Sequence, residues 1–288
     1  MFTELGLYKC RCVLTDVKSS APTLTHVIPS QGRLGVTAVT SLGDDVFVVR
    51  WWSQQVEVYD AKTFTLQRHI TVPGLGECSW GLAACAHYKC LYVSGGDNVS
   101  VHRAELSGSS AVKRWFVANG PRGLSVNKAH NVVVACFKAN MIHEYTTRGD
   151  LVREICLHQP GLTSPWQAIQ LSTGHYVVSQ CTSHGLVSVV GVDGQVVYRY
   201  RPSRASDVGQ MSFPMGLAVK MNDDILVADN KAILQMNSSL SSAQQLTLAV
   251  DGGIRLPRGL CLDESRGRLY VGEFGGSRRV LVFDCVRL

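Results

Sequence analysis

The sequence predicts an all-β protein that folds as a six-bladed β-propeller of four-stranded antiparallel blades. Three observations carry this prediction. A unit of 42 to 49 residues recurs along the chain, each unit contains short β-rich runs separated by turns, and no long amphipathic helical pattern occurs. Four strands in each repeat of this length are typical of propeller blades.

Two columns of residues define the repeat. The first is the residue before each Gly-Leu-like pair, here called the anchor, and the anchors are Leu34, Trp80, Arg122, Trp166, Met215 and Arg258. A valine follows each anchor by 12 to 14 residues, at Val48, Val93, Val134, Val178, Val227 and Val271. Two columns that keep their register over six units indicate one repeated structural element.

The expected strands are clearest in the last unit. GLCLD (259–263) and RLYVGEF (268–274) are β-rich runs, ESRG between them is typical of a turn, and RVLVFD (279–284) follows a glycine turn. The earlier units add a fourth run; these runs are TLQRHITV (65–72), AVKRWFVA (111–118), LVREICL (151–157), VVYRYR (196–201) and QLTLAVD (245–251).

The last unit has room for only three strands. We expect TLTHVIP, residues 23–29, to supply the fourth strand of this blade. That pairing joins the two chain ends and removes an open sheet edge, which would otherwise invite aggregation. The propeller is therefore expected to span residues 23–288, with residues 1–22 as an N-terminal extension packed on or near it.

Composition narrows the class of protein. The chain of 288 residues is 45% hydrophobic and 17% charged, which is too apolar for a disordered chain. It has no run of 18 apolar residues, so we expect no membrane partner. Its ten cysteines lack the usual zinc-ligand spacing, and Cys85 and Cys136 lie in apolar runs, so we expect reduced thiols and a cytoplasmic location. The net charge of +6 permits a phosphate-bearing partner without requiring one.

Two segments resemble the repeats of NHL-type six-bladed propellers: LPRGLCLDESRGRLYVGEFGGSRRVLVFD (256–284) and FPMGLAVKMNDDILVADN (213–230). GPRGLSVNKAHNVVVACF (120–137) and SPWQAIQLSTGHYVVSQC (164–181) are weaker copies, and the Asn-His-Leu tripeptide itself is absent. The chain is similar in particular to the propellers that end tripartite-motif (TRIM) ubiquitin ligases. That resemblance implies a domain that binds a target, RNA or protein, while ligase activity would need a RING domain outside these residues.

The candidate binding residues lie in two sets of loops. In a propeller of this connectivity, the loops before the first strands and the loops between the second and third strands open on one face. The expected charge contacts are Arg50, Arg122, Lys138, Lys231, Arg258 and Arg278. The expected stacking or apolar contacts are Trp52, Trp80, Phe137, Trp166 and Phe274. Arginine forks suit phosphate or carboxylate and aromatic faces suit bases, so the expected partner is single-stranded or hairpin RNA, or an acidic or apolar protein segment, and not DNA.

Two simpler interpretations stay open at this point. Trp80 and Trp166 recur at one repeat position, so these rings either pack between blades or bind a ligand. A single arginine in a loop is usually only solvated, so the prediction depends on the whole set of residues.

Catalysis is the more distant alternative. Six-bladed propellers include calcium-dependent lactonase-like hydrolases and a zinc-dependent amidating lyase, whose sites need carboxylates or histidines at the central channel. The candidates for such a site are Asp229, Asn230, Glu273, His143, His175 and His184. The histidines lack metal-ligand spacing and Asp229 fits a carboxylate that braces a loop, so we expect no enzyme, no metal and no cofactor.

Overall fold

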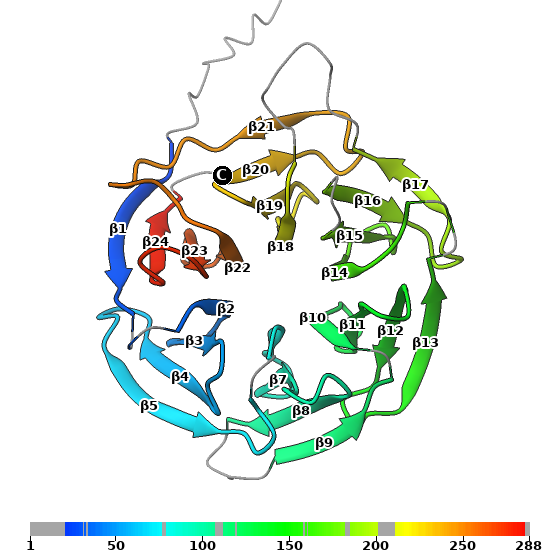
Figure 1. The fold of residues 1–288 in the computed structure, drawn as a ribbon, viewed down its shortest axis with the longest axis horizontal. Helices are drawn as coiled ribbons and strands as arrows, with labels where there is room; N and C mark the ends of the chain where they lie inside the picture. The colour runs from blue at the N-terminus through cyan, green and yellow to red at the C-terminus, as the bar shows by residue number, and fades with distance from the viewer. Residues whose placement is uncertain are drawn as a thin grey trace, which may run out of the picture.

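The computed structural model describes residues 21–30, 32, 34–76, 79–106, 112–118, 120–157, 159, 161–181, 185–200 and 211–285. Within these residues the chain forms six four-stranded antiparallel sheets and no helix, and Figure 1 shows the sheets as blades in a ring. The predicted all-β six-bladed propeller is therefore confirmed. No helix in this part of the chain is long and apolar enough to span a membrane.

We number the blades from the one that follows Leu34. Blade 1 consists of β2 (Val36–Leu42), β3 (Asp45–Arg50), β4 (Gln55–Asp60) and β5 (Leu66–Thr71). Blade 2 consists of β6 (Leu82–Cys85), β7 (Cys90–Ser94), β8 (Ser100–Glu105) and β9 (Val112–Phe116). Blade 3 consists of β10 (Pro121–Val126), β11 (Val132–Cys136), β12 (Met141–Tyr145) and β13 (Leu151–Cys156).

The other three blades repeat this order. Blade 4 consists of β14 (Pro165–Gln170), β15 (Tyr176–Gln180), β16 (Leu186–Val190) and β17 (Val196–Arg199). Blade 5 consists of β18 (Pro214–Val219), β19 (Ile225–Asp229), β20 (Ala232–Met236) and β21 (Ala243–Gln245). Blade 6 consists of β22 (Pro257–Asp263), β23 (Arg268–Glu273), β24 (Val280–Asp284) and β1 (Thr23–Ile28).

The ring closes within blade 6, as the sequence predicts. β1 runs antiparallel to β24, with Thr23 opposite Asp284 and Ile28 opposite Val280. Figure 1 shows β1, in blue, as the outer strand beside β24, in red. The ends of the propeller are thus held by one sheet, and β24 has no free edge.

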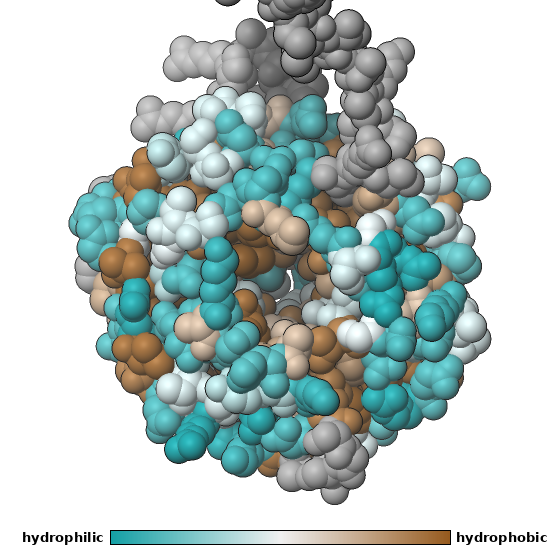
Figure 2. Space-filling model, turned by 180° about the vertical axis from the view of Figure 1, so that it is seen from behind, coloured by the Kyte–Doolittle hydropathy of each residue, from teal (hydrophilic) through white to brown (hydrophobic). Residues whose placement is uncertain are grey.

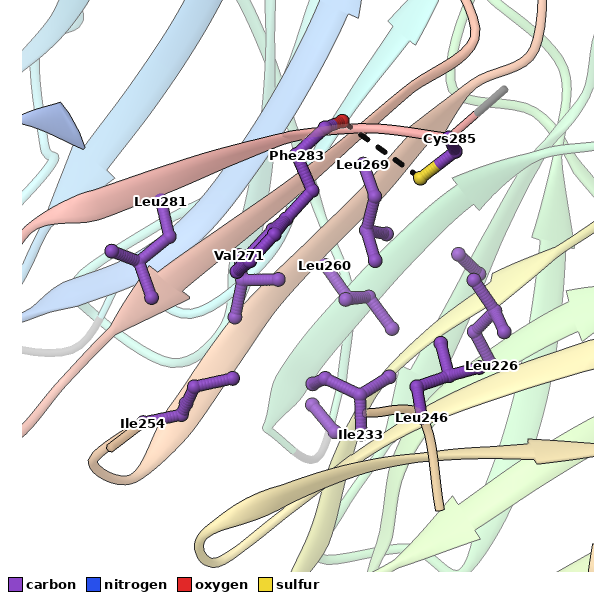
Figure 3. Packing of buried hydrophobic residues seen from close by; sticks show 12 residues of the cluster. Leu226, Ile233, Leu246, Ile254, Leu260, Leu269, Val271, Leu281, Phe283 and Cys285 are labelled. Atoms are coloured by element: carbon purple, nitrogen blue, oxygen red, sulfur yellow. Dashed lines mark hydrogen bonds between the residues drawn. The ribbon is translucent and has the colours of Figure 1, made fainter. Parts of the chain in front are cut away.

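The core consists of apolar layers between neighbouring blades. The valines of the second repeat column lie in the second strands and are fully buried; they are Val48, Val93, Val134, Val178, Val227 and Val271. Figure 3 shows one layer, in which Leu226 and Ile233 of blade 5 belong to the same cluster as Leu260, Leu269 and Phe283 of blade 6. Each blade therefore depends on its neighbour to bury its apolar face.

The fourth strand of blade 5 is shorter than predicted. β21 ends at Gln245, whereas the expected run was 245–251. Leu246 still donates its backbone N–H to the carbonyl of Ile233, but the chain then leaves the sheet, and Leu248 and Val250 pack against the cluster between blades 5 and 6. The alternating apolar residues fill the space between two blades here instead of forming a strand.

All seven cysteines in the described part of the chain are free thiols. Burial raises the pKa of Cys136 to about 12, as expected for an unreactive structural thiol. Cys10, Cys12 and Cys78 lie outside the described residues, and so does the expected N-terminal extension as far as residue 20.

Candidate binding site at the channel mouth

One face of the propeller collects the loops that sequence reasoning singled out. Pro121, which begins an inner strand, pairs with Cys136, which ends the next strand, and Pro257 pairs with Glu273 in the same way. The loop before each inner strand therefore lies beside the loop between the second and third strands. We call the face that these two sets of loops form the mouth face.

A local break in strand pairing places the anchors at the axis. In blade 6 the register shifts between Pro257 and Gly259, at Arg258, and blades 3, 4 and 5 shift at the equivalent position. A residue in such a bulge is left out of the ladder, and its side chain is re-aimed. The bulge thus frees the side chains of Arg122, Trp166 and Arg258 to meet at the centre of the ring.

Two guanidinium groups and four aromatic rings gather there. We call this group the arginine–aromatic cluster, and its members are Trp80, Arg122, Phe137, Trp166, Arg258 and Phe274. Cζ of Arg258 lies 3.5 Å from the ring centre of Phe274 and 4.9 Å from that of Trp80. Cζ of Arg122 lies 5.2 Å from the ring centres of both Trp80 and Phe137. Six of the residues that the sequence suggested thus form one contiguous group.

Trp80, Trp166 and Arg258 come from blades 2, 4 and 6 and contact one another across the axis. The two tryptophan rings have centres 5.3 Å apart, and Cζ of Arg258 is 5.8 Å from the ring centre of Trp166. The rings therefore pack against each other across the channel mouth rather than between the faces of adjacent blades. Ligand binding by these rings stays a prediction.

The channel itself is too narrow for a ligand. It is lined by residues of the inner strands such as Thr37, Leu82 and Leu260, and leaves about 20 Å³ for the centres of water molecules. That space holds one or two waters. Figure 2, which views the molecule from the side opposite to Figure 1, shows a small hollow at the centre of the ring. A larger molecule is therefore confined to the surface at the mouth.

Arg258 is held in the cluster by rings rather than by a carboxylate. Its Nε and Nη1 atoms are buried without a hydrogen-bond partner. Burial lowers the pKa of Arg258 to about 10, and the positive charge of Arg122 acts in the same direction. Arg258 nevertheless stays protonated at neutral pH. Nη1 of Arg122, by contrast, donates to Oδ1 of Asn98 at 3.1 Å.

Four exposed apolar side chains lie beside this cluster, on the adjacent blades 5, 6 and 1. We call them the apolar rim; they are Phe213 (46% exposed), Leu256 (43%), Trp51 (36%) and Trp52 (50%). The ring of Trp51 has its centre 5.6 Å from those of both Trp52 and Phe274. Phe274 donates its backbone N–H to the carbonyl of Leu256, which links the rim to the cluster.

Sequence reasoning found Trp52 but missed the other three rim residues. Phe213 and Leu256 both stand two places before an anchor, where blades 1, 3 and 4 have Gly32, Gly120 and Ser164. Alignment of the six units at that position could have found them. Trp51 carries no comparable signal, because only the fold shows that its ring lies between Trp52 and Phe274.

The two acids that end β19 and β23 turn inward. Asp229 accepts the backbone N–H groups of Ser212 and Phe213, and burial raises the pKa of this carboxyl while those two bonds oppose the rise. Glu273 is fully buried; it accepts the backbone N–H of Arg255 and pairs with Nε of Arg279 at 3.0 Å. Both carboxylates brace loops, so neither offers its charge to the surface of the mouth face.

Arg50 is not placed as the sequence suggested. Its side chain is 1% exposed, and its Nε lies 2.8 and 2.9 Å from the two carboxylate oxygens of Glu57. Nη1 and Nη2 donate to the carbonyls of Arg278 and Pro29. The expected charge contact with a ligand is corrected, because every nitrogen of this guanidinium already has an acceptor. Nε bonds Glu57 within blade 1, and Nη1 and Nη2 tie blade 1 to the closure of blade 6.

The remaining predicted cations surround the cluster without joining it. Lys138 and Lys231 are exposed in the loops that follow β11 and β19, and Arg278 is half-buried in the loop between β23 and β24. They stay predicted charge contacts. Lys138 and Lys231 give the mouth face exposed positive charge in addition to that of Arg122 and Arg258.

The candidates for a catalytic metal site do not converge. His143 is buried in β12, where its Nδ1 lies 3.0 Å from the hydroxyl of Tyr145. His175 lies in the turn between β14 and β15, at the other end of the strands, and His184 is outside the described residues. In the part of the chain that is described, no three His, Cys, Asp or Glu residues could hold one metal ion.

Comparison with known proteins shows the fold alone. No protein-family model matches the chain, and no curated protein matches it either. A streptogramin B lyase is 10% identical with a TM-score of 0.66, covering 90% of this chain and 96% of that one. Hydrazine synthase of Kuenenia stuttgartiensis is 14% identical with a TM-score of 0.65, covering 91% and 99%. A chain of the nidogen–laminin complex is 14% identical with a TM-score of 0.63, covering 82% and 88%.

These neighbours contradict the sequence-based prediction that the chain is not an enzyme. A lyase and a synthase share its architecture, so the propeller fold gives no ground for excluding catalysis. At 10% and 14% identity the likeness also transfers no activity to this chain. What the chain does must be argued from its own mouth face.

Proposed function

We propose that the mouth face binds a protein partner through a segment that carries apolar and acidic side chains. The observation that carries the proposal is the apolar rim, where two tryptophans, Phe213 and Leu256 are 36% to 50% exposed beside the arginine–aromatic cluster. Tryptophan and arginine are the residue types that dominate protein-binding hot spots. Monomeric proteins rarely expose several large apolar side chains together without a partner.

Charge complementarity supports an acidic segment. The carboxylates of Asp229 and Glu273 accept hydrogen bonds from loop amides, and Glu273 also pairs with Arg279. Lys138 and Lys231, in contrast, are exposed. Carboxylates of a partner would meet this uncompensated positive charge as its apolar side chains cover the rim. A chain of similar fold in the solved nidogen–laminin complex supports the use of such a propeller in protein binding.

RNA is the less favoured ligand, for a geometric reason. The rings of Trp80, Trp166 and Phe274 are in contact with guanidinium groups or with one another, so they are not open platforms for bases. Recognition of single strands relies on such open aromatic faces along a basic groove. Among the predicted stacking residues, Trp52 is the one with an exposed ring.

The resemblance to NHL-repeat propellers suggests the setting of this recognition. We propose a cytoplasmic, tripartite-motif-like ubiquitin ligase in which the mouth face captures the target. Any ligase chemistry would then be carried by a RING domain outside these residues.

A displayed peptide library tests the proposed function. Peptides that place Asp or Glu beside Trp, Phe or Leu should be selected, and fluorescence anisotropy would then measure their affinity for the chain. Trp52→Ala and Leu256→Ala should each weaken binding about tenfold or more, as hot-spot truncations do. Phe116→Ala is the matched control, because Phe116 is 69% exposed on the outer strand β9 of blade 2, whereas the apolar rim lies on blades 5, 6 and 1.

Two outcomes would overturn the proposal. One is equal peptide affinity in the rim variants and in Phe116→Ala. The other is tighter binding of a single-stranded RNA oligonucleotide, with an affinity that falls steeply as salt rises, which would make RNA the ligand.

A further inference from the structure

Arg258 and Trp80 of the arginine–aromatic cluster carry buried nitrogen donors that lack an acceptor. They are Nε and Nη1 of Arg258 and Nε1 of Trp80. Among the described residues, Arg258 is the one side chain that has two buried atoms of this kind. Guanidinium and indole nitrogens only donate hydrogen bonds, so what is missing at this point of the cluster is an acceptor.

The local charge indicates what kind of acceptor is missing. Arg122 and Arg258 share the rings of Trp80 and Trp166, so two positive charges lie against the same pair of indoles. The buried carboxylates of Asp229 and Glu273 on this face are directed to loop amides and to Arg279. A neutral acceptor such as water would satisfy a donor but leave this charge uncompensated, whereas an oxyanion does both.

The stacking of Arg258 leaves its donors available. A ring whose centre lies 3.5 Å from Cζ covers a face of the guanidinium plane, while the N–H groups point outward within that plane. The residue is partly exposed at the mouth while its Nε and Nη1 are buried, so these donors reach an anion from solvent when the guanidinium turns outward. Neither Nε nor Nη1 gives up a hydrogen bond when the guanidinium turns outward, and a charge-assisted bond is then gained.

We propose that the channel mouth holds one oxyanion, a carboxylate or phosphate group, on the guanidinium of Arg258 with the indole N–H of Trp80 as a second donor. Arg122 adds positive charge against the same pair of indoles. The inference rests on the proposed function and narrows it: the partner segment is recognised by one acidic group at the axis, and its apolar side chains cover the rim. The ion fits at the mouth surface, since the channel below holds only one or two waters.

Titration of the free chain with small anions tests this site without a partner. N-acetyl-aspartate amide and acetate serve as the carboxylate arm, inorganic phosphate and phosphoserine as the phosphate arm, and chloride at equal ionic strength as the reference. Tryptophan emission should change saturably, because Arg258 contacts both Trp80 and Trp166. The class of anion with the lower dissociation constant, carboxylate or phosphate, identifies the group that the site binds.

Arg258→Met should raise the dissociation constant of the tighter-binding anion about tenfold or more, whereas Arg258→Lys should retain part of the affinity. Arg255→Met is the matched control, because Arg255 is an exposed cation three residues earlier. An unchanged dissociation constant in Arg258→Met would overturn the proposal, as would an emission change that never saturates.

A measurement on the unmodified chain covers the case in which the Arg258 variants fail to fold. The charges of Arg258 and Arg122 act on the Cys181 thiol and oppose the rise that burial causes in its pKa. A bound oxyanion cancels that charge, so alkylation of Cys181 should slow severalfold relative to Cys156, a half-buried thiol on β13. Equal rates with and without the anion would contradict the site.

The two proposals fail in different ways. If selected peptides bind through the rim but keep their affinity after Asp→Asn and Glu→Gln exchange, the oxyanion site is wrong and the proposed function stands. If small anions bind at Arg258 but no peptide binds at the rim, the proposed function is wrong.

Discussion

Arg50 and Arg258 are both guanidinium groups on the loops of one face, yet their charges are compensated in opposite ways. Arg50 is 1% exposed, and all its nitrogens donate to Glu57 or to backbone carbonyls. Arg258 is stacked on Phe274, and two of its nitrogens donate to nothing. A guanidinium removed from water needs acceptors, so Arg50 serves stability while Arg258 keeps the capacity to bind.

At the scale of single residues, Arg50→Met should destabilise the fold by about 3–5 kcal/mol, because it leaves the buried carboxylate of Glu57 without its cation. Tyr59 still donates to Oε2 of Glu57, which limits the loss. Urea unfolding would measure the change, and Arg50→Met combined with Glu57→Leu should recover part of it. Arg278→Met is the control, because Arg50 bonds the backbone of Arg278 and not its side chain. A loss below about 1 kcal/mol would contradict the buried-pair assignment.

The sequence located individual site residues only where the repeat marked them. Trp80, Arg122, Trp166 and Arg258 occupy one recurring position, so their convergence could be predicted. Arg50 could not be told from a solvated arginine, because its partner Glu57 lies across the β3–β4 hairpin and becomes visible only with the strand register.

At the scale of elements, the glycine after the anchor allows the inner strands to approach closely. A Cβ at Gly123 would lie 2.6 Å from the carbonyl oxygen of Trp166 and 2.7 Å from Cβ of Gln167, both in the next blade. The same crowding at other blades explains why Gly-Leu-like pairs mark the repeat.

Gly123→Ala should therefore cost about 1–3 kcal/mol, because the backbone of blade 3 or blade 4 must shift to admit the methyl group. Thermal unfolding followed by tryptophan fluorescence would record the loss and a change in the Trp166 environment. Gly76→Ala is the control, since nothing lies within 4 Å of a Cβ at that position. Equal unfolding temperatures for the two variants would show that close approach does not require this glycine.

Prediction was strongest for the inner strands and weakest at the outer edge of the blades. The inner strands are buried and carry both repeat columns, whereas the outer strand of blade 5 is reduced to Ala243–Gln245. Leu248 and Val250 alternate as a strand would, but their burial is supplied by the space between two blades. Periodicity reports that a residue is buried; it does not report which neighbour buries it.

For the whole molecule, the architecture does not determine the function. Lyase, synthase and laminin-complex chains share this fold at 10% to 14% identity, so the ring of blades acts as a scaffold. What distinguishes this chain is the side chains at the mouth: two arginines against four rings, with an apolar rim beside them. The repeat made the scaffold predictable, whereas the grouping of the rim residues into one surface required the three-dimensional placement of loops from three blades.

The closure of the ring gives the prediction that belongs to the whole molecule. Residues 30–288 lack β1, which exposes the edge of β24 and removes the fully buried Ile28 from the core between blades 6 and 1. Relative to residues 20–288, this chain should unfold about 5–10 °C lower. Its free edge should also cause concentration-dependent self-association, measured by analytical ultracentrifugation.

A synthetic peptide of residues 21–30, added in trans, should raise the unfolding temperature and suppress the association, because it restores the same antiparallel pairing. Identical unfolding temperatures for the two chains would mean that five blades and a three-stranded sheet hold the ring without this strand.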